Sequence, residues 1–67
     1  MIYYDKLFQM LENKGLNKFW LRNNGINPKT IQALSQNKQV NTNTINKLCN
    51  ILKCTPSDIM EYAPDEE

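Results

Sequence analysis

Hydrophobic residues recur along the N-terminal part of the chain at helical spacing. Four of them follow the i, i+3, i+4, i+7 rule of an amphipathic helix: Tyr4, Leu7, Phe8 and Leu11. The spacing predicts a first helix over residues 3–14. Gly15 follows directly and is typical of a C-terminal cap, because glycine adopts the left-handed conformation at no steric cost.

Two shorter helices are predicted next from their start signals. Asn17 can cap a second helix, from Lys18 to Asn23 or Asn24, whose apolar atoms come from Phe19, Trp20 and Leu21. In a domain this small we expect both aromatic rings in the core. Asn27 followed by a proline at the first helical position starts a third helix, residues 28–36. Its Ile31 and Leu34 face inward, and the remaining face is polar without being acidic.

The C-terminal half predicts two more helices. Thr42 caps a fourth helix, in which four residues again show helical spacing: Ile45, Leu48, Cys49 and Leu52. A last short helix, reaching Tyr62, is predicted from its start signals. Thr55 supplies the cap, Pro56 the proline at the first helical position, and Asp58 a carboxylate three residues after the cap. No strand alternation competes with these patterns. We therefore predict an all-α fold of five short helices around one core.

Charge is distributed unevenly along the chain. Residues 13–57, called the central stretch below, contain seven basic residues and no acidic one, whereas residues 58–67 contain five acidic residues and no basic one. The central stretch also holds all ten asparagines, whose amides suit phosphates, base edges and helix caps alike. Charged faces that only solubilise normally mix both signs. The pattern indicates a polyanion-binding surface, with an ordinary solvated surface as the alternative.

Composition narrows the classes of function. The chain has 67 residues, no histidine, two glycines and two cysteines, which fit one small domain with a small core. The chain lacks the residues for general acid–base chemistry near neutral pH, for glycine-rich phosphate loops and for four-ligand zinc sites. We expect a binding protein and not an enzyme, with no metal and no cofactor. No apolar run approaches the roughly 18–20 residues of a membrane span, so we expect a cytoplasmic protein.

The two cysteines, Cys49 and Cys54, lie five residues apart. On one continuous helix this spacing separates them by about 140° around the axis, so they face different sides and do not easily form a disulfide. We interpret them as two small core residues in a reducing compartment. The alternative is a redox or metal role, such as a redox sensor with accessible thiols.

The second and third predicted helices are separated by Gly25-Ile26-Asn27. A glycine permits a tight turn there, and a buried apolar residue, here Ile26, pins the turn to the core. Two short helices joined in this way are typical of a helix-turn-helix, which we place at about residues 17–37.

Several stretches together carry a resemblance to a known family: Gly15-Leu16-Asn17-Lys18, Leu21-Arg22, Gly25 to Ile31, and Cys54 to Tyr62. Through them the chain resembles the Cro/CI-type (XRE-like, lambda-repressor-like) helix-turn-helix regulators of bacteria and phages, and most of all their small single-domain members. The resemblance implies DNA binding with the third helix in the major groove. The chain departs from the family in a second helix one residue shorter than usual. It also has Pro28 where a base-reading side chain is common.

The resemblance also divides the binding roles. Base reading is implied for the outward residues of the third helix: Lys29, Thr30, Gln32 and Ala33. Lysine can donate to guanine, glutamine can pair with adenine, and the threonine and alanine methyl groups can contact the thymine methyl. Phosphate contacts are implied for seven residues: Asn17, Lys18, Asn27, Asn37, Lys38, Thr42 and Asn43. Asn27 and Thr42 are helix caps on their own account.

We therefore expect a sequence-specific double-stranded DNA-binding transcriptional regulator, a repressor that occludes a promoter. Residues 1–62 form the helix-turn-helix domain and residues 63–67 an acidic tail that lies away from the basic face. The alternative is a protein-interaction module on the same fold, such as an antirepressor or an antitoxin, that uses the apolar terminal surfaces.

A homodimer is expected because one small module contacts about one half-site. Apolar residues near both ends are candidates for its interface: Ile2, Tyr3, Tyr4, Ile59, Met60 and Tyr62. The alternative is that these side chains complete the core of a monomer.

Overall fold

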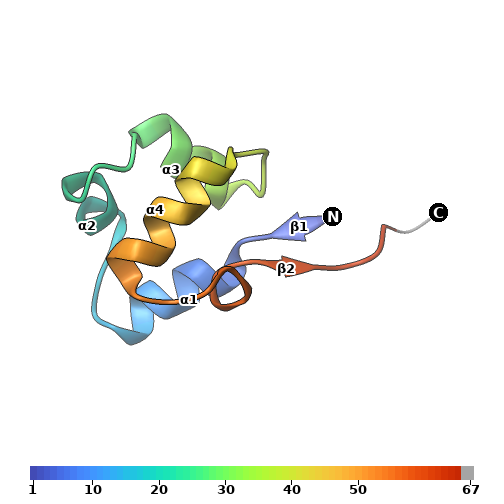
Figure 1. Ribbon diagram of the computed structural model, residues 1–67, viewed down its shortest axis with the longest axis horizontal. Helices are drawn as coiled ribbons and strands as arrows, with labels where there is room; N and C mark the ends of the chain where they lie inside the picture. Colours follow the sequence, from blue (N-terminus) through green and yellow to red (C-terminus); the bar gives the residue numbers. More distant parts are fainter. Residues whose placement is uncertain (66–67) are drawn as a thin grey trace.

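The computed structural model describes residues 1–65, and in this part of the chain it contains four α-helices, a two-stranded sheet and one 3₁₀ turn. The elements follow one another as β1 (Ile2–Tyr3), α1 (Asp5–Asn13), α2 (Lys18–Asn23), α3 (Pro28–Ser35), α4 (Thr42–Leu52), the 3₁₀ turn (Pro56–Asp58) and β2 (Glu61–Tyr62). The helices gather around one centre, and the two strands extend from it as a ribbon that carries both chain ends (Figure 1). Within residues 1–65, no helix has the length and apolar character needed to span a membrane.

The core takes its side chains from all four helices of the described chain, from the turn between α2 and α3, and from the segments that join the helices to β1 and β2. Ten hydrophobic residues are buried in it: Tyr4, Leu7, Leu11, Leu21, Ile26, Ile31, Leu34, Leu48, Leu52 and Ile59. Within α1, α3 and α4 they stand three or four residues apart, as the sequence predicts, and the predicted burial of Ile26 is confirmed. Each fully buried leucine stabilises the fold by about 2 kcal/mol.

The start signals of α2 and α3 work as predicted. Asn17 Oδ1 accepts a hydrogen bond from the Trp20 N–H at 3.1 Å, and Asn27 Oδ1 accepts one from the Lys29 N–H at 2.8 Å. Helix α2 ends at Asn23, within the predicted range. The chain from Asn17 to Asn27 therefore forms a helix and a turn from local signals.

The cap predicted for the fourth helix is one residue off. Asn41, and not Thr42, is the cap, since Asn41 Oδ1 accepts from the Thr44 N–H at 2.9 Å and from the Thr44 hydroxyl at 3.1 Å. Thr42 is the first residue inside α4. Both residue types cap helices well, so the sequence alone does not distinguish two neighbours.

The predicted fifth helix is wrong, because the described chain forms only a 3₁₀ turn over Pro56–Asp58. The start signal itself is present: the Thr55 N–H and hydroxyl both donate to Asp58 Oδ2, at 2.9 and 3.0 Å. Directly afterwards Ile59 enters the core with no exposed surface, and the chain then extends into β2. Burial of Ile59 and strand pairing thus end the helix after one turn.

The β1–β2 ribbon replaces the outer ends of the predicted first and fifth helices. Ile2 lies opposite Tyr62 and Tyr3 opposite Glu61 in an antiparallel pair, so α1 begins at Asp5 and not at residue 3. The strands lie almost sixty residues apart in the sequence. A local hydrophobic pattern cannot reveal such a partner.

The two ends of the described chain are held together beyond the ribbon. The Ala63 N–H donates to the Met1 carbonyl at 2.9 Å, and the Met1 ammonium lies 3.0 Å from the Asp65 carboxylate. The remaining residues of the expected acidic tail, Glu66 and Glu67, lie outside the described residues.

The six candidate dimer residues fall into three groups by burial, and Tyr3 on β1 belongs to the half-buried group. Tyr4 and Ile59 are buried in the core, so neither side chain is available at a surface. Ile2 and Met60 are half-buried against the core. Tyr62 is 66% exposed on the ribbon.

Candidate nucleic-acid interface

The turn between α2 and α3 is fixed from two sides. Gly25 has a φ of 93°, and the following Ile26 N–H donates to the Leu21 carbonyl at 3.0 Å, which closes the end of α2. From the other side Lys47 of α4 donates from Nζ to the Gly25 carbonyl at 2.9 Å. A Cβ atom at Gly25 would lie 2.6 Å from that Nζ atom. The positive φ favours glycine here, and the missing Cβ leaves room for the lysine to reach the carbonyl.

The outward surface of α3 is narrower than the sequence suggests. Lys29 and Gln32 are exposed, and we call the solvent-facing side of α3 that they form its crest. Thr30 and Ala33 are half-buried because they turn toward the loop before α4, where both line a shallow hollow beside Val40. The four predicted base-reading residues therefore lie on one helix, two at its crest and two at its flank.

One flank of α3 is formed by the start of α4. Asn43 and Lys47 line a hollow together with Thr30 and the turn. Helix α4 has 11 residues, and its N-terminus presents backbone N–H groups and a partial positive charge. Lys38, in the loop between the helices, is exposed. This flank brings Thr30 of α3 and Asn43 of α4 to the same hollow.

Asn37 serves the fold through its side-chain oxygen. It has a φ of 55° at the end of α3, a left-handed conformation that asparagine tolerates better than most residues. Its Oδ1 atom accepts a hydrogen bond from the Tyr4 N–H at 2.9 Å. The oxygen of this candidate phosphate-binding residue thus joins the N-terminal segment to the end of α3.

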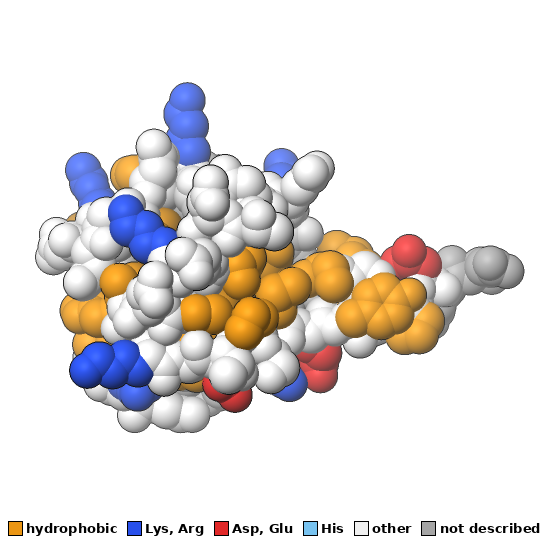
Figure 2. All heavy atoms as spheres, viewed as in Figure 1, with side chains coloured by type: hydrophobic (Ala, Val, Ile, Leu, Met, Phe, Trp, Pro, Cys, Tyr) orange, Lys and Arg blue, Asp and Glu red, His pale blue; other side chains and the backbone are white. Residues whose placement is uncertain are grey.

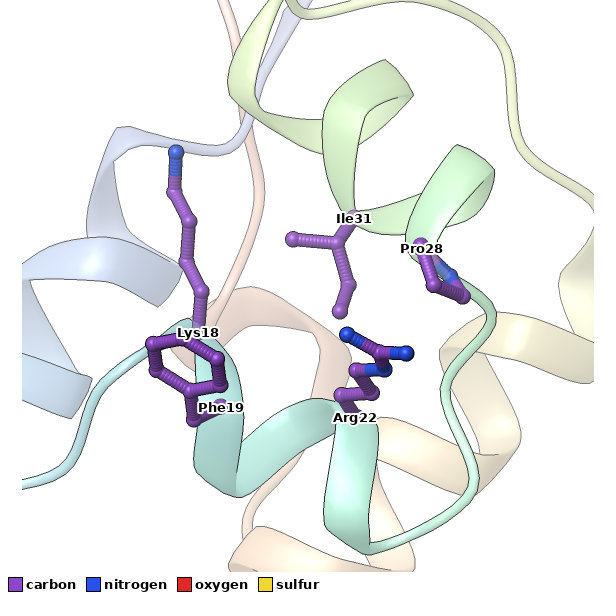
Figure 3. A pocket seen from close by; sticks show the side chains of 5 residues that line it. All are labelled: Lys18, Phe19, Arg22, Pro28 and Ile31. Atoms are coloured by element: carbon purple, nitrogen blue, oxygen red, sulfur yellow. The ribbon is translucent and has the colours of Figure 1, made fainter.

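The other flank of α3 is formed by α2, and here one sequence prediction is wrong. Phe19 is not in the core: its side chain is 69% exposed, whereas Trp20 packs against the core as predicted. The reason is that Leu21 alone fills the buried position of the six-residue α2. Lys18 points away from Phe19 (Figure 3). Its Nζ lies 5.6 Å from the ring centroid of Phe8 in α1.

The electrostatic pattern of the sequence carries over to the surface. Several lysine and arginine side chains project from the part of the molecule that holds α2 and α3, and others lie along the lower edge toward α1 and the end of α4 (Figure 2). The acidic side chains visible in the same view lie toward α1 and the ribbon. Within residues 1–65, none of the basic side chains of the central stretch forms an ion pair. The surface around α3 is therefore positive and uncompensated by neighbouring carboxylates.

The two cysteines lie closer than a continuous helix would place them. Helix α4 ends at Leu52, Lys53 takes a φ of 53°, and the Cys54 N–H folds back to the Cys49 carbonyl at 3.0 Å. Both thiols are half-buried against the core. Burial, and then the neighbouring Cys49, raise the pKa of the Cys54 thiol. No cluster of three or more metal-ligating side chains occurs in the described part of the chain.

Comparisons with known proteins agree with this geometry. The family model of the Cro/C1-type HTH DNA-binding domain matches residues 6–65, which include α2, α3 and α4 entirely and α1 without its first residue. A solved structure, "Crystal structure of transcriptional regulator VanUg, Form II", is similar with 29% sequence identity and a TM-score of 0.88. The match covers 96% of this chain and 87% of that one. Among curated proteins no match to the chain was found.

Proposed function

This chain belongs to the family of Cro/C1-type helix-turn-helix DNA-binding domains, and from this premise we propose that it is a sequence-specific transcriptional regulator of double-stranded DNA that acts as a repressor. The observation that carries the proposal is the surface of α3, whose exposed Lys29 and Gln32 stand in a positive region without acidic neighbours. The solved relative VanUg is named a transcriptional regulator. We place the protein in the cytoplasm of a bacterium, as host or phage protein.

In the proposed complex α3 enters the major groove. Lys29 donates to guanine O6 or N7, and Gln32 pairs with the edge of an adenine. Thr30 and Ala33, at the flank of α3, offer methyl groups to thymine. These contacts specify the sequence.

Phosphate contacts position the domain on the duplex. On one side Lys38 and the N-terminus of α4, with Thr42 and Asn43, face one strand. On the other side the start of α2, with Asn17 and Lys18, faces the opposite strand. Asn27 and Asn37 contribute mainly by holding the helices, since their side-chain oxygens accept hydrogen bonds from Lys29 and Tyr4.

Repression would follow from occupancy alone. We propose that residues 1–62 form the DNA-binding domain and that residues 63–67 form an acidic tail. Asp65, which pairs with the Met1 ammonium, belongs to the ribbon end of the molecule. Repulsion between the tail and DNA favours an orientation in which α3 faces the groove and the ribbon faces away.

A homodimer would join two half-sites one helical turn apart. The exposed Tyr62, which lies opposite Ile2, makes the β1–β2 ribbon the surface we propose for the homodimer, and Tyr3 lies opposite Glu61 on the other face of the ribbon. Sedimentation from micromolar to millimolar protein, with and without DNA, tests this assembly. A monomeric mass throughout would remove the dimer and leave the DNA-binding proposal standing.

Alanine substitutions at Lys29 and Lys38 test the function against its alternative, a protein-interaction module on the same fold. Fluorescence anisotropy is measured with a duplex from the region upstream of the gene and with a scrambled duplex. Lys29→Ala should remove the preference for the native duplex, and Lys38→Ala should weaken binding to both duplexes about equally. Absence of binding at low salt would shift the assignment to the interaction module and its apolar terminal surfaces.

A further inference from the structure

An apolar hollow lies beside the start of α3. It has a volume of about 270 Å³ and is lined by Lys18, Phe19, Arg22, Pro28 and Ile31 (Figure 3). The Phe19 ring, 69% exposed, is the most exposed large hydrophobic side chain of residues 1–65. A single exposed apolar side chain is ordinary, but this one also lines a hollow next to the start of α3.

The hollow adjoins the DNA-facing crest of α3 through Pro28. This residue opens α3, and the next residue is the exposed Lys29. Because proline has no N–H, Pro28 has no donor for a polar base edge, but its ring offers apolar surface. Whatever fills the hollow therefore contacts the chain through apolar atoms directly next to the residues proposed to read bases.

The rim of the hollow is positive. Arg22 rises from α2 between Phe19 and Pro28, toward α3 (Figure 3), and within residues 1–65 its side chain forms no ion pair. An occupant with an apolar group and a negative charge close to it would match this lining. A DNA duplex offers both features in its major groove. The 5-methyl group of thymine is apolar, and the phosphates of the backbone close to it are negatively charged.

We infer that the hollow formed by Phe19 and Pro28 binds the 5-methyl group of a thymine at the edge of the sequence that α3 reads, with Arg22 on an adjacent phosphate. This inference rests on the proposed function and adds to it a specificity-determining residue outside α3. It predicts that part of the preference for a DNA sequence comes from Phe19, the second residue of α2.

Uracil scanning tests the inference because it removes the methyl group and leaves the base pair intact. Duplexes bound by the wild-type protein are selected from a random-sequence pool, and each thymine of the best duplex is replaced by uracil in turn. At one thymine per half-site the substitution should weaken binding roughly fourfold, the effect of losing one buried methyl group. Phe19→Ala should abolish this particular penalty, so that both duplexes bind equally.

Two further variants separate a direct contact from a general weakening. Phe19→Leu keeps an apolar side chain and should retain most of the uracil penalty. Gln32→Ala, on the crest of α3, should weaken binding while leaving the penalty at that thymine intact. Because Phe19 is exposed, circular dichroism should show the same thermal midpoint for both Phe19 variants.

The outcomes distinguish this inference from the function on which it rests. Selective binding with uracil penalties that are identical in wild type and Phe19→Ala overturns the thymine contact and leaves the DNA-binding proposal intact. Failure of the wild-type protein to enrich any sequence overturns both. Absence of a uracil penalty at every thymine in the wild-type protein also contradicts the inference.

Discussion

Asparagine side chains of the central stretch are engaged largely within the fold. Asn17, Asn27 and Asn41 cap three helices, and Asn24 donates from Nδ2 to the Trp20 carbonyl at 2.7 Å. The first two caps follow from the sequence, because asparagine directly precedes a helical pattern in both cases. The link from Asn37 to Tyr4 spans 33 residues, so no local pattern predicts it. An asparagine-rich basic stretch is thus weaker support for phosphate contacts than its composition suggests.

Substitution of Asn37 separates a structural role from a phosphate contact. Asn37→Ala should lower the free energy of unfolding by about 1–2 kcal/mol, because it removes a partly buried hydrogen bond and places alanine at positive φ. Asn37→Asp keeps an oxygen acceptor and should retain most of the stability. Chemical denaturation measures both. Unchanged stability in Asn37→Ala together with weaker DNA binding would show that phosphate contact is its main role.

The raised pKa of Cys54 predicts slow thiol chemistry. Since the thiolate is the reactive form, alkylation of the native protein near pH 8 should be slower than alkylation of the unfolded chain. The alkylation rate of Cys54 in the native protein should therefore reach half of its plateau at a higher pH than in the unfolded chain. Mass spectrometry of timed iodoacetamide reactions reports both cysteines. Rapid labelling at neutral pH would instead favour the redox-sensor alternative.

At the scale of elements, the sequence predicts the helix-turn-helix well and the chain ends poorly. Helices α2 and α3 each have an N-terminal cap and an apolar side, and Gly25 supplies the turn between them. All of these signals lie within a few positions of one another. The ribbon depends on contacts between Ile2 and Tyr62, so its signal lies outside any local window. The sequence also predicts burial of Phe19, which is wrong. Hydrophobic character leads to burial only where the helix has a core-facing position for the side chain, and in α2 Leu21 occupies it.

The contact between α4 and the turn predicts a role for Lys47 in stability. Lys47→Met should lower the free energy of unfolding by about 1 kcal/mol, because it removes the hydrogen bond to the Gly25 carbonyl while keeping the aliphatic stem. Lys38→Met, at another exposed lysine, is the matched control and should change stability little. Equal effects of the two substitutions in urea denaturation would argue against a specific role of Lys47 at the turn.

The 3₁₀ turn makes the stability depend on acidity. The Thr55 backbone N–H and then its hydroxyl, both bonded to Asp58, hold the pKa of that carboxyl below its usual value. A depressed pKa means that the charged form favours folding. This contribution is present above about pH 4 and is lost as the pH falls through the folded-state pKa.

Asp58→Asn should therefore flatten the fall of stability that we expect for the wild-type protein below about pH 4. Thr55→Val, which removes the hydroxyl and keeps the N–H, should have a partial effect. Denaturation midpoints across the acidic range measure both variants. A wild-type pH dependence retained in Asp58→Asn would exclude this hydrogen-bonded pair as its source.

At the scale of the whole molecule, a net charge of +1 conceals a strong asymmetry. The described chain extends 39 × 23 × 17 Å, with basic side chains around α2 and α3 and acidic ones toward α1 and the ribbon (Figure 2). Such a distribution orients the molecule toward a polyanion before any contact forms. The sequence predicts this asymmetry, because it depends on composition along the chain and not on precise packing.

The salt dependence of specific binding tests the central claim, that the α3 surface reads duplex DNA, most directly. Anisotropy titrations of a selected duplex and a scrambled duplex are compared across about 50–200 mM salt. We predict a log–log slope of roughly −3 to −5 for both duplexes, as expected for a few released counterions, with tighter binding to the selected duplex at every salt concentration. Equal affinity for the two duplexes, or binding that does not change with salt, would contradict the account.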